Sequence, residues 1–93
     1  MNHDVVNPPP PHIRMDVGEK LRSKREAVGM SVEDLAGRLN LRTSFIQAVE
    51  EGRGGQHMDW AYERIHLRSM TRILDLDFDS MIGGSYRDSH EGA

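Results

Sequence analysis

Apolar residues between positions 17 and 82 recur at intervals of three and four, which places their side chains along one face of a helix. Val17, Leu21 and Val28 form the first such face, and Gly29 follows where a glycine suits the left-handed position beyond a helix end. No stretch shows the two-residue alternation typical of a strand. The pattern predicts an all-α fold of five short helices.

Capping residues place the starts of four of these helices. Asp16, Ser31, Thr43 and Asp77 stand at the openings of apolar stretches, and their side-chain oxygens can accept hydrogen bonds from first-turn amides. Arg42 is the alternative start of the third helix, with Thr43 the better cap. Ser31 and Asp34 also form a capping box, in which Asp replaces the usual Glu or Gln. The expected helices cover residues 17–28, 32–40, 43–51, 59–75 and 78–82.

Prolines and glycines set the limits of the expected domain. The run Pro8–Pro11 favours polyproline II, so residues 1–15 are predicted to be a disordered, Pro-rich tail. Gly83–Gly84 is expected to stop the fifth helix, which leaves residues 85–93 as a second flexible tail. The compact helical domain is therefore expected to span residues 16–84.

The fourth expected helix carries an apolar side and a basic stripe. The apolar side is expected to contain Ala61, Ile65, Met70, Ile73 and Leu74. Arg64, Arg68 and Arg72 are spaced four apart, so they form one stripe that Trp60 extends by a turn. The stripe is a candidate contact for DNA phosphates or an acidic partner, and a solvated face paired with neighbouring acids is the alternative. Trp60 is expected in the core, with an exposed anchor for a partner as its alternative.

Composition excludes several classes of function. At 93 residues the chain is expected to form one domain, too small for a large enzyme with a deep cleft. It contains no cysteine, so it has no disulfide, thiolate zinc site or cysteine nucleophile. Its five histidines lack metal-ligand spacing, and no catalytic pattern is recognisable, so no enzyme activity, metal or cofactor is expected. No apolar run has membrane-spanning length and no signal peptide is visible, so we expect a cytoplasmic protein away from the membrane.

The net charge of −3 weighs against simple non-specific binding to nucleic acid, but the charge is unevenly distributed. Residues 14–42 hold seven basic and five acidic side chains, whereas residues 43–93 hold five basic and nine acidic ones. A basic front half is compatible with DNA on one side of the molecule. The small excess of basic residues predicts modest affinity for a monomer.

The second and third helices are separated by about three residues, around Asn40, Leu41 and Arg42. A turn this short sets the two helices at a steep angle and presents the second outward, as in a helix-turn-helix. Residues 17–53 resemble the Cro/XRE-type helix-turn-helix. The motifs that carry the resemblance are Gly18–Glu26, Met30–Ala36 and Phe45–Arg53.

The downstream helices narrow the resemblance. Tyr62-Glu63-Arg64 and the run Leu67–Asp77 are similar to the fourth and fifth helices of RodZ-type cytoplasmic domains. Domains of that type are membrane-anchored and bind bacterial actin through aromatic residues of the fourth helix. This chain has no transmembrane segment, and it carries Ile65-His66 and Met70 at the positions that usually include aromatic residues. The resemblance therefore implies the fold, without the actin contact.

The Cro/XRE resemblance implies binding to duplex DNA through the third helix, usually by a dimer on paired half-sites. Thr43, Ser44 and Gln47 occupy the outward start of that helix, where hydroxyl and amide groups can bond phosphates and base edges. Ala48 is placed to touch a thymine methyl group. The alternatives are a capping role for Thr43 and a solvated surface for Gln47 and Ala48.

Phosphate contacts are expected around the same unit. Arg42 precedes the third helix and Arg53 follows it, and both could bind phosphates. Ser31 and Val32 lie where family members place the N-terminus of the second helix against the DNA backbone. Glu51 would repel phosphates.

Arg25 and Glu50 occupy positions at which the family often forms a structural ion pair between the first and third helices. We interpret them in that way here. Such a pair fixes the angle of the recognition helix, and removal of one partner would leave a poorly paired charge.

These features favour a sequence-specific, double-stranded DNA-binding transcription regulator. Weak monomer binding predicts a homodimer or a second regulatory protein, with RNA polymerase as one candidate. The alternative is a protein-interaction adaptor of RodZ-like fold, with a partner in the transcription machinery or the cytoskeleton and little DNA binding. The sequence indicates neither a target site nor activation as opposed to repression.

Overall fold

The computed structural model describes residues 8–91, with side chains described through Asp88. Over this range the chain is helical, with no strand, which confirms the predicted all-α, five-helix fold. In chain order the elements are α1 (Pro11–Ala27), α2 (Val32–Leu39), α3 (Thr43–Glu50), the short 3-10 helix η1 (Gly54–Gln56), α4 (Trp60–Ile73) and α5 (Phe78–Glu91).

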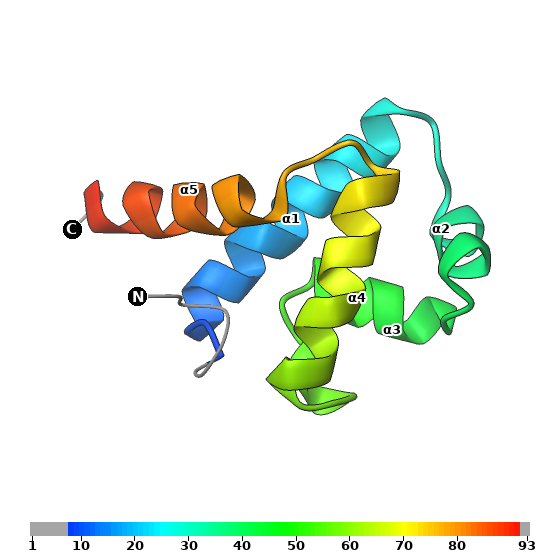
Figure 1. Ribbon diagram of the computed structural model, residues 1–93, viewed down its shortest axis with the longest axis horizontal. Helices are drawn as coiled ribbons and strands as arrows, with labels where there is room; N and C mark the ends of the chain where they lie inside the picture. Colours follow the sequence, from blue (N-terminus) through cyan, green and yellow to red (C-terminus); the bar gives the residue numbers. More distant parts are fainter. Residues whose placement is uncertain (1–7, 92–93) are drawn as a thin grey trace.

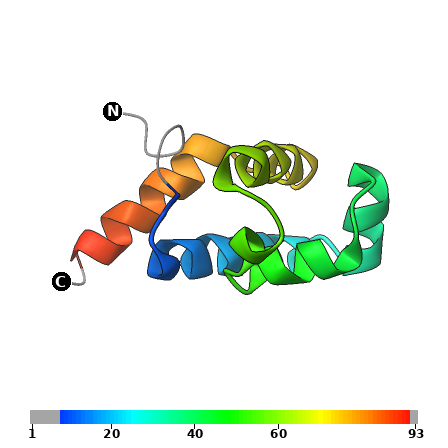
Figure 2. The same cartoon turned by 90° about the horizontal axis from the view of Figure 1, so that it is seen from below.

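The helices form two layers around one core. Figure 2 shows α1 and α3 in one layer, α4 and the start of α5 in the other, and α2 at one end. Helix α1 runs through the middle of the molecule and packs against both α5 and α3 (Figure 1). Each of the five α-helices supplies at least one fully buried side chain, and so does the residue that follows α4. These side chains are Ile13, Leu21, Leu35, Ile46, Met70, Thr71, Leu74 and Ser85.

Helix α1 begins at Pro11, five residues before the predicted cap at Asp16. A proline at the first helical position loses no hydrogen bond, because that amide has no partner within the helix. Ile13 is fully buried, and its packing extends the helix toward the N-terminus. The predicted tail is therefore wrong for residues 11–15, and residues 1–7 lie outside the described part of the chain.

Helix α5 continues through Gly83–Gly84 to Glu91, so the predicted stop is wrong, and so is the predicted flexible tail over residues 85–91. Residues 92–93 lie outside the described part of the chain. The cause is packing against α1. Ser85 is buried there, and Lys20 donates hydrogen bonds to the Ser85 hydroxyl at 3.0 Å and to the Met81 carbonyl at 3.5 Å. These contacts outweigh the weak helix preference of two glycines.

Four of the predicted helix ends are correct. Ser31 and Asp34 form the capping box of α2, and the Asp77 carboxylate accepts a hydrogen bond from the Ser80 amide at 2.8 Å in the first turn of α5. Gly29 and Gly52 take left-handed conformations, with φ of +73° and +79°, just beyond α1 and α3.

Two predicted caps are wrong. Arg42, without a side-chain bond, is the N-cap of α3, and Thr43 is the first helical residue. Asp16 lies inside α1, one turn before Lys20, and forms an ion pair with it at 3.2 Å.

The inner side of α4 differs from the prediction. Met70 and Leu74 are buried as expected, but Ala61 is exposed and Ile65 is 51% exposed. Glu63 lies on the inner side instead, because its carboxylate pairs with the Arg14 guanidinium of α1. An ion-pair partner 49 positions away allows a charged residue to replace an apolar one on this face.

No helix within the described residues is long and apolar enough to cross a bilayer.

Candidate nucleic-acid interface

A three-residue turn connects α2 to α3. Asn40 closes α2 in the left-handed conformation, with φ of +56°, and Asn tolerates this region better than most residues. The Leu41 amide then donates to the Ala36 carbonyl at 2.9 Å, which completes the helix end. The chain changes direction within residues 40–42, so α3 runs from the end of α2 back toward the middle of the molecule (Figure 1).

Helix α3 is amphipathic. Phe45, Ile46 and Val49 are buried in the core, whereas three residues spaced three and four apart are exposed. We call these exposed residues, Ser44, Gln47 and Glu51, the outer stripe. Thr43 lies beside the stripe and is half-buried.

Ala48 does not belong to the outer stripe. It is 1% exposed, so its methyl group cannot reach a base in this conformation. The prediction was based on helical position alone, which does not show that η1 packs against α3. We therefore leave Ala48 out of the candidate interface.

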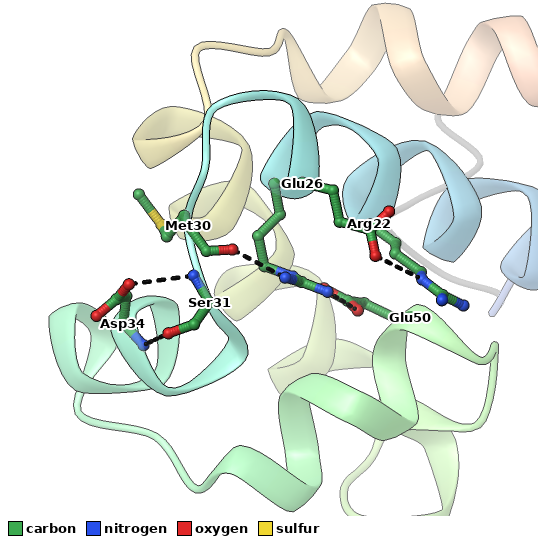
Figure 3. Close-up of polar contacts among 7 residues, drawn as sticks. Arg22, Glu26, Met30, Ser31, Asp34 and Glu50 are labelled. Atoms are coloured by element: carbon green, nitrogen blue, oxygen red, sulfur yellow. Dashed lines mark hydrogen bonds and ion pairs between the residues drawn. The ribbon is translucent and has the colours of Figure 1, made fainter.

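An ion pair fixes the C-terminal end of α3 to α1. The Arg25 guanidinium donates to the two carboxylate oxygens of Glu50 at 2.6 and 3.0 Å, and both side chains are nearly buried (Figure 3). A third nitrogen of Arg25 donates to the carbonyl of Met30, the residue before the N-cap of α2, at 2.8 Å. The hydrogen bonds with Glu50 raise the pKa of Arg25. This is the pair expected from the Cro/XRE resemblance.

Gly18 allows α1 and α3 to approach closely. A β-carbon at this position would lie 2.5 Å from the carbonyl oxygens of both Val49 and Glu50, a distance that real contacts do not reach. One sequence signal points to this contact, a glycine inside an otherwise helical pattern. Together with the Arg25–Glu50 pair, it fixes the direction in which the outer stripe points.

The N-terminus of α2 lies next to α3 and is already capped. The Ser31 amide donates to Asp34 at 3.1 Å, and the Asp34 amide donates to the Ser31 hydroxyl at 2.9 Å (Figure 3). The bond from the Ser31 amide to the Asp34 carboxylate, and next the nearby Ser31 hydroxyl, lower the pKa of Asp34. The backbone amides of Val32 and Glu33 lie in the first turn but outside the capping box. A phosphate bound at this helix end would therefore contact these two amides and not the Ser31 amide.

A family model of a helix-turn-helix domain matches residues 20–81 of the chain. The match covers well over half of the sequence and includes α2, the turn and α3. The chain belongs to this helix-turn-helix family. Membership indicates a DNA-binding type of domain rather than an enzyme. No solved structure matches the chain.

In this helix-turn-helix domain the two arginines that flank the recognition helix differ in their surroundings. Arg42 is exposed at the N-cap of α3. Arg53 is held by neighbouring side chains. Its Nε donates to Glu51 Oε1 at 3.0 Å, its Nη2 donates to the same oxygen, and its Nη1 donates to Gln56 at 3.2 Å.

A groove of mixed charge borders the recognition helix. It lies between α1, α2 and α3, and Val32 and Gln47 are among its lining residues. The charged residues that line it are Arg22, Arg25, Glu26, Glu50 and Glu51. Arg22 pairs with Glu26 at 3.2 Å, so opposite charges within this groove are largely matched to one another.

The basic stripe of α4 is not part of the α2–α3 surface, because α4 lies in the other layer of the helix-turn-helix domain (Figure 2). Arg68 lies over the Phe78 ring at 4.4 Å and pairs with Asp79 at 3.4 Å, so it joins α4 to α5. Arg72 is exposed and Arg64 is half-buried. Trp60 is buried in the core, which supports the first of its two interpretations.

Two histidines contact the recognition helix and were not predicted to do so. The rings of His57 and His66 meet the Phe45 ring edge-on, with centroids 5.9 and 5.7 Å away. Among the described residues, no group of three or more His, Asp or Glu side chains is arranged to hold a metal ion.

Proposed function

We propose that this protein is a sequence-specific DNA-binding regulator of transcription whose helix α3 enters the major groove of duplex DNA. The observation that carries the proposal is the outer stripe on a recognition helix whose orientation is fixed by Gly18 and the Arg25–Glu50 pair. Base-specific bonds require side chains held in a fixed register, which such a scaffold provides.

The outer stripe carries suitable chemistry for base edges. The Gln47 amide can bond adenine at both N6 and N7, and the Ser44 hydroxyl can donate to or accept from a base or a phosphate. Thr43 would bind a phosphate at the edge of the major groove. Arg42 and the free first-turn amides of α2 would bind the DNA backbone on either side.

We further propose that a second copy of the chain or a partner protein raises the affinity. The arginines at the C-terminal end of α3 are paired to carboxylates, so few cations there remain for phosphates. The affinity for DNA depends on the number of phosphates that cations contact. Two modules on adjacent half-sites would compensate through effective concentration.

Substitutions of Gln47 and Arg42 test this function. Gln47→Ala should weaken binding to the preferred site about 5- to 100-fold and leave binding to unrelated DNA nearly unchanged. Arg42→Ala should weaken binding to all sequences and reduce the slope of log affinity against log salt by about 1. Genome-wide occupancy would first identify the sites, and fluorescence anisotropy would then measure the affinities.

Arg87→Ala serves as the matched control, because Arg87 is an exposed arginine on α5. It should leave both the affinity and the salt slope unchanged. Absence of discrete sites for the wild-type protein would contradict the proposed function.

A second candidate function is that of a protein-interaction adaptor with little DNA binding. The observation that favours it is a pair of exposed apolar side chains on α4, Tyr62 at 63% and Ile65 at 51%. An adaptor would lose binding of its partner on Ile65→Ser and keep it on Arg42→Ala. A DNA-binding regulator would lose binding to its DNA sites on Arg42→Ala and keep it on Ile65→Ser.

A further inference from the structure

Each arginine at the C-terminal end of the recognition helix donates to a carboxylate. Arg25 is bonded to Glu50, Arg22 to Glu26 and Arg53 to Glu51. The first pair is nearly buried and fixes α3 to α1, and the second is an i,i+4 pair along α1.

The pair of Glu51 and Arg53 has neither of these structural roles. The two side chains are 58% and 48% exposed, and the residues stand only two positions apart in the turn after α3. Glu51 is also the C-cap of α3, where the helix dipole disfavours a negative charge. A carboxylate at this place therefore does not serve the stability of the helix.

The geometry of the pair occupies the donors that a phosphate would use. Nε and Nη2 of Arg53 both donate to one oxygen of Glu51, and Nη1 donates to the side chain of Gln56. A DNA phosphate binds arginine through the same planar fork. At the Nε–Nη2 edge a phosphate can bind Arg53 only by displacing this carboxylate, and Glu51 belongs to the outer stripe itself.

We propose that Glu51 limits the DNA affinity of this protein by competing with phosphate for the Arg53 guanidinium. The proposal rests on the proposed function, because it concerns the same surface. It assigns opposite effects to two adjacent charges: Glu51 weakens binding, and Arg53 strengthens it only when Glu51 is neutral or displaced.

Glu51→Gln tests the proposal through a gain in affinity. Exposed ion pairs of this kind shift equilibria about two- to fivefold, and removal of a repulsive charge adds to this, so we expect binding about three- to tenfold tighter at low salt. Arg53 would then bind one more phosphate, which should steepen the salt slope by about 0.9. The probe is a fluorescently labelled duplex of mixed sequence, titrated at several salt concentrations.

A double-mutant cycle separates competition from simple repulsion. Arg53→Ala should change the affinity less than twofold in the wild-type background and should abolish the gain in the Glu51→Gln background. Asp88→Asn is the matched control, since Asp88 is also an exposed carboxylate paired with a cation, Lys20, but lies on α5. It changes the net charge equally and should change the affinity less than twofold.

The outcomes distinguish the inference from the proposed function. If the wild-type protein binds the duplex and Glu51→Gln gives no gain, or a gain that Asp88→Asn reproduces, the inference is wrong. A gain that survives Arg53→Ala would overturn it as well, because competition would play no part. If no variant, Glu51→Gln included, shows salt-dependent binding, the proposed function itself fails.

Discussion

Glu63 is the most deeply buried carboxylate among the described residues, at 3% exposure. Its charged neighbour is Arg14 of α1, and the other side chains around this site are apolar ones such as Val17 of α1, Val49 of α3 and Ile82 of α5. Burial raises the pKa of Glu63, and the Arg14 charge opposes the shift only in part. The folded state therefore holds a proton on Glu63 more tightly than the unfolded state does.

Because the pKa of Glu63 is raised, its contribution to the stability of the protein falls as the pH rises. The contribution of Glu63 is fully present below the ordinary pKa of a glutamate and is lost as the pH rises through the raised value. Glu63→Gln should therefore flatten the fall in the free energy of unfolding across that range. Urea denaturation at a series of pH values measures the effect.

Glu33→Gln, on an exposed glutamate of α2, is the control for the loss of one carboxylate from the surface. Asp16, Asp34 and Asp77 have lowered pKa values, so their contributions are lost as the pH falls. They are common to all variants, and the difference between profiles isolates Glu63. Parallel profiles for Glu63→Gln and the wild-type protein would contradict the assignment.

The sequence could not reveal this site, although it revealed others. The Ser31 capping box and the Asp77 cap were predictable because partners within three residues form them. The Arg14–Glu63 pair joins residues 49 positions apart, and Ala48 is buried through contacts beyond its own helix. Arg25–Glu50 was expected only because a family resemblance supplied the pairing.

Two glycines inside helices have opposite surroundings. A β-carbon at Gly18 would meet the carbonyl oxygens of Val49 and Glu50 at 2.5 Å, whereas one at Gly37 of α2 would meet nothing within 4 Å. Backbone atoms cannot yield as the end of a side chain can, so α3 itself would have to move away from α1.

We expect Gly18→Ala to destabilise the protein by about 1–3 kcal/mol through overpacking. Gly37→Ala should stabilise it by about 0.5–1 kcal/mol, because alanine loses less backbone entropy in a helix. Denaturant unfolding of both variants measures these changes. Equal effects of the two substitutions would show that α1 and α3 are not in close contact at Gly18.

Helix limits were predictable where local chemistry decides them. Gly29 and Gly52 take the left-handed conformations expected at helix ends. Pro11 and Gly83–Gly84 did not act as expected, because the helices that contain them are held by packing between α1 and α5. Helix propensities describe how much such residues destabilise a helix. They do not describe the tertiary contacts whose stabilisation is larger.

At the scale of the whole molecule, the first turns of α1 belong to the core. Ile13 is fully buried, and the family match begins only at Lys20, so this part of the core lies outside the matched segment. The five-helix fold was predictable from hydrophobic spacing, but the extension of the packed core to Ile13 was not.

Ile13→Ala should lower the free energy of unfolding by about 2–4 kcal/mol, the usual cost of truncating a large aliphatic core residue. His12→Ala, at the exposed neighbouring position, should change it by less than about 0.5 kcal/mol. Thermal or denaturant unfolding followed by circular dichroism gives both values. A negligible effect of Ile13→Ala would show that residues 11–15 contribute little to the folded unit.

Trp60 is the one tryptophan of the chain, and it lies where three parts of the molecule meet. The Arg14 guanidinium of α1 covers its ring at 5.6 Å, and Pro9 and Ile82 line the same small cavity. Intrinsic tryptophan fluorescence therefore reports on one location, the contact between the N-terminal turn of α1 and the start of α4. If that turn detaches before the rest of the protein unfolds, the emission will change at a lower denaturant concentration than the helical signal, and coincident curves will mean a single transition.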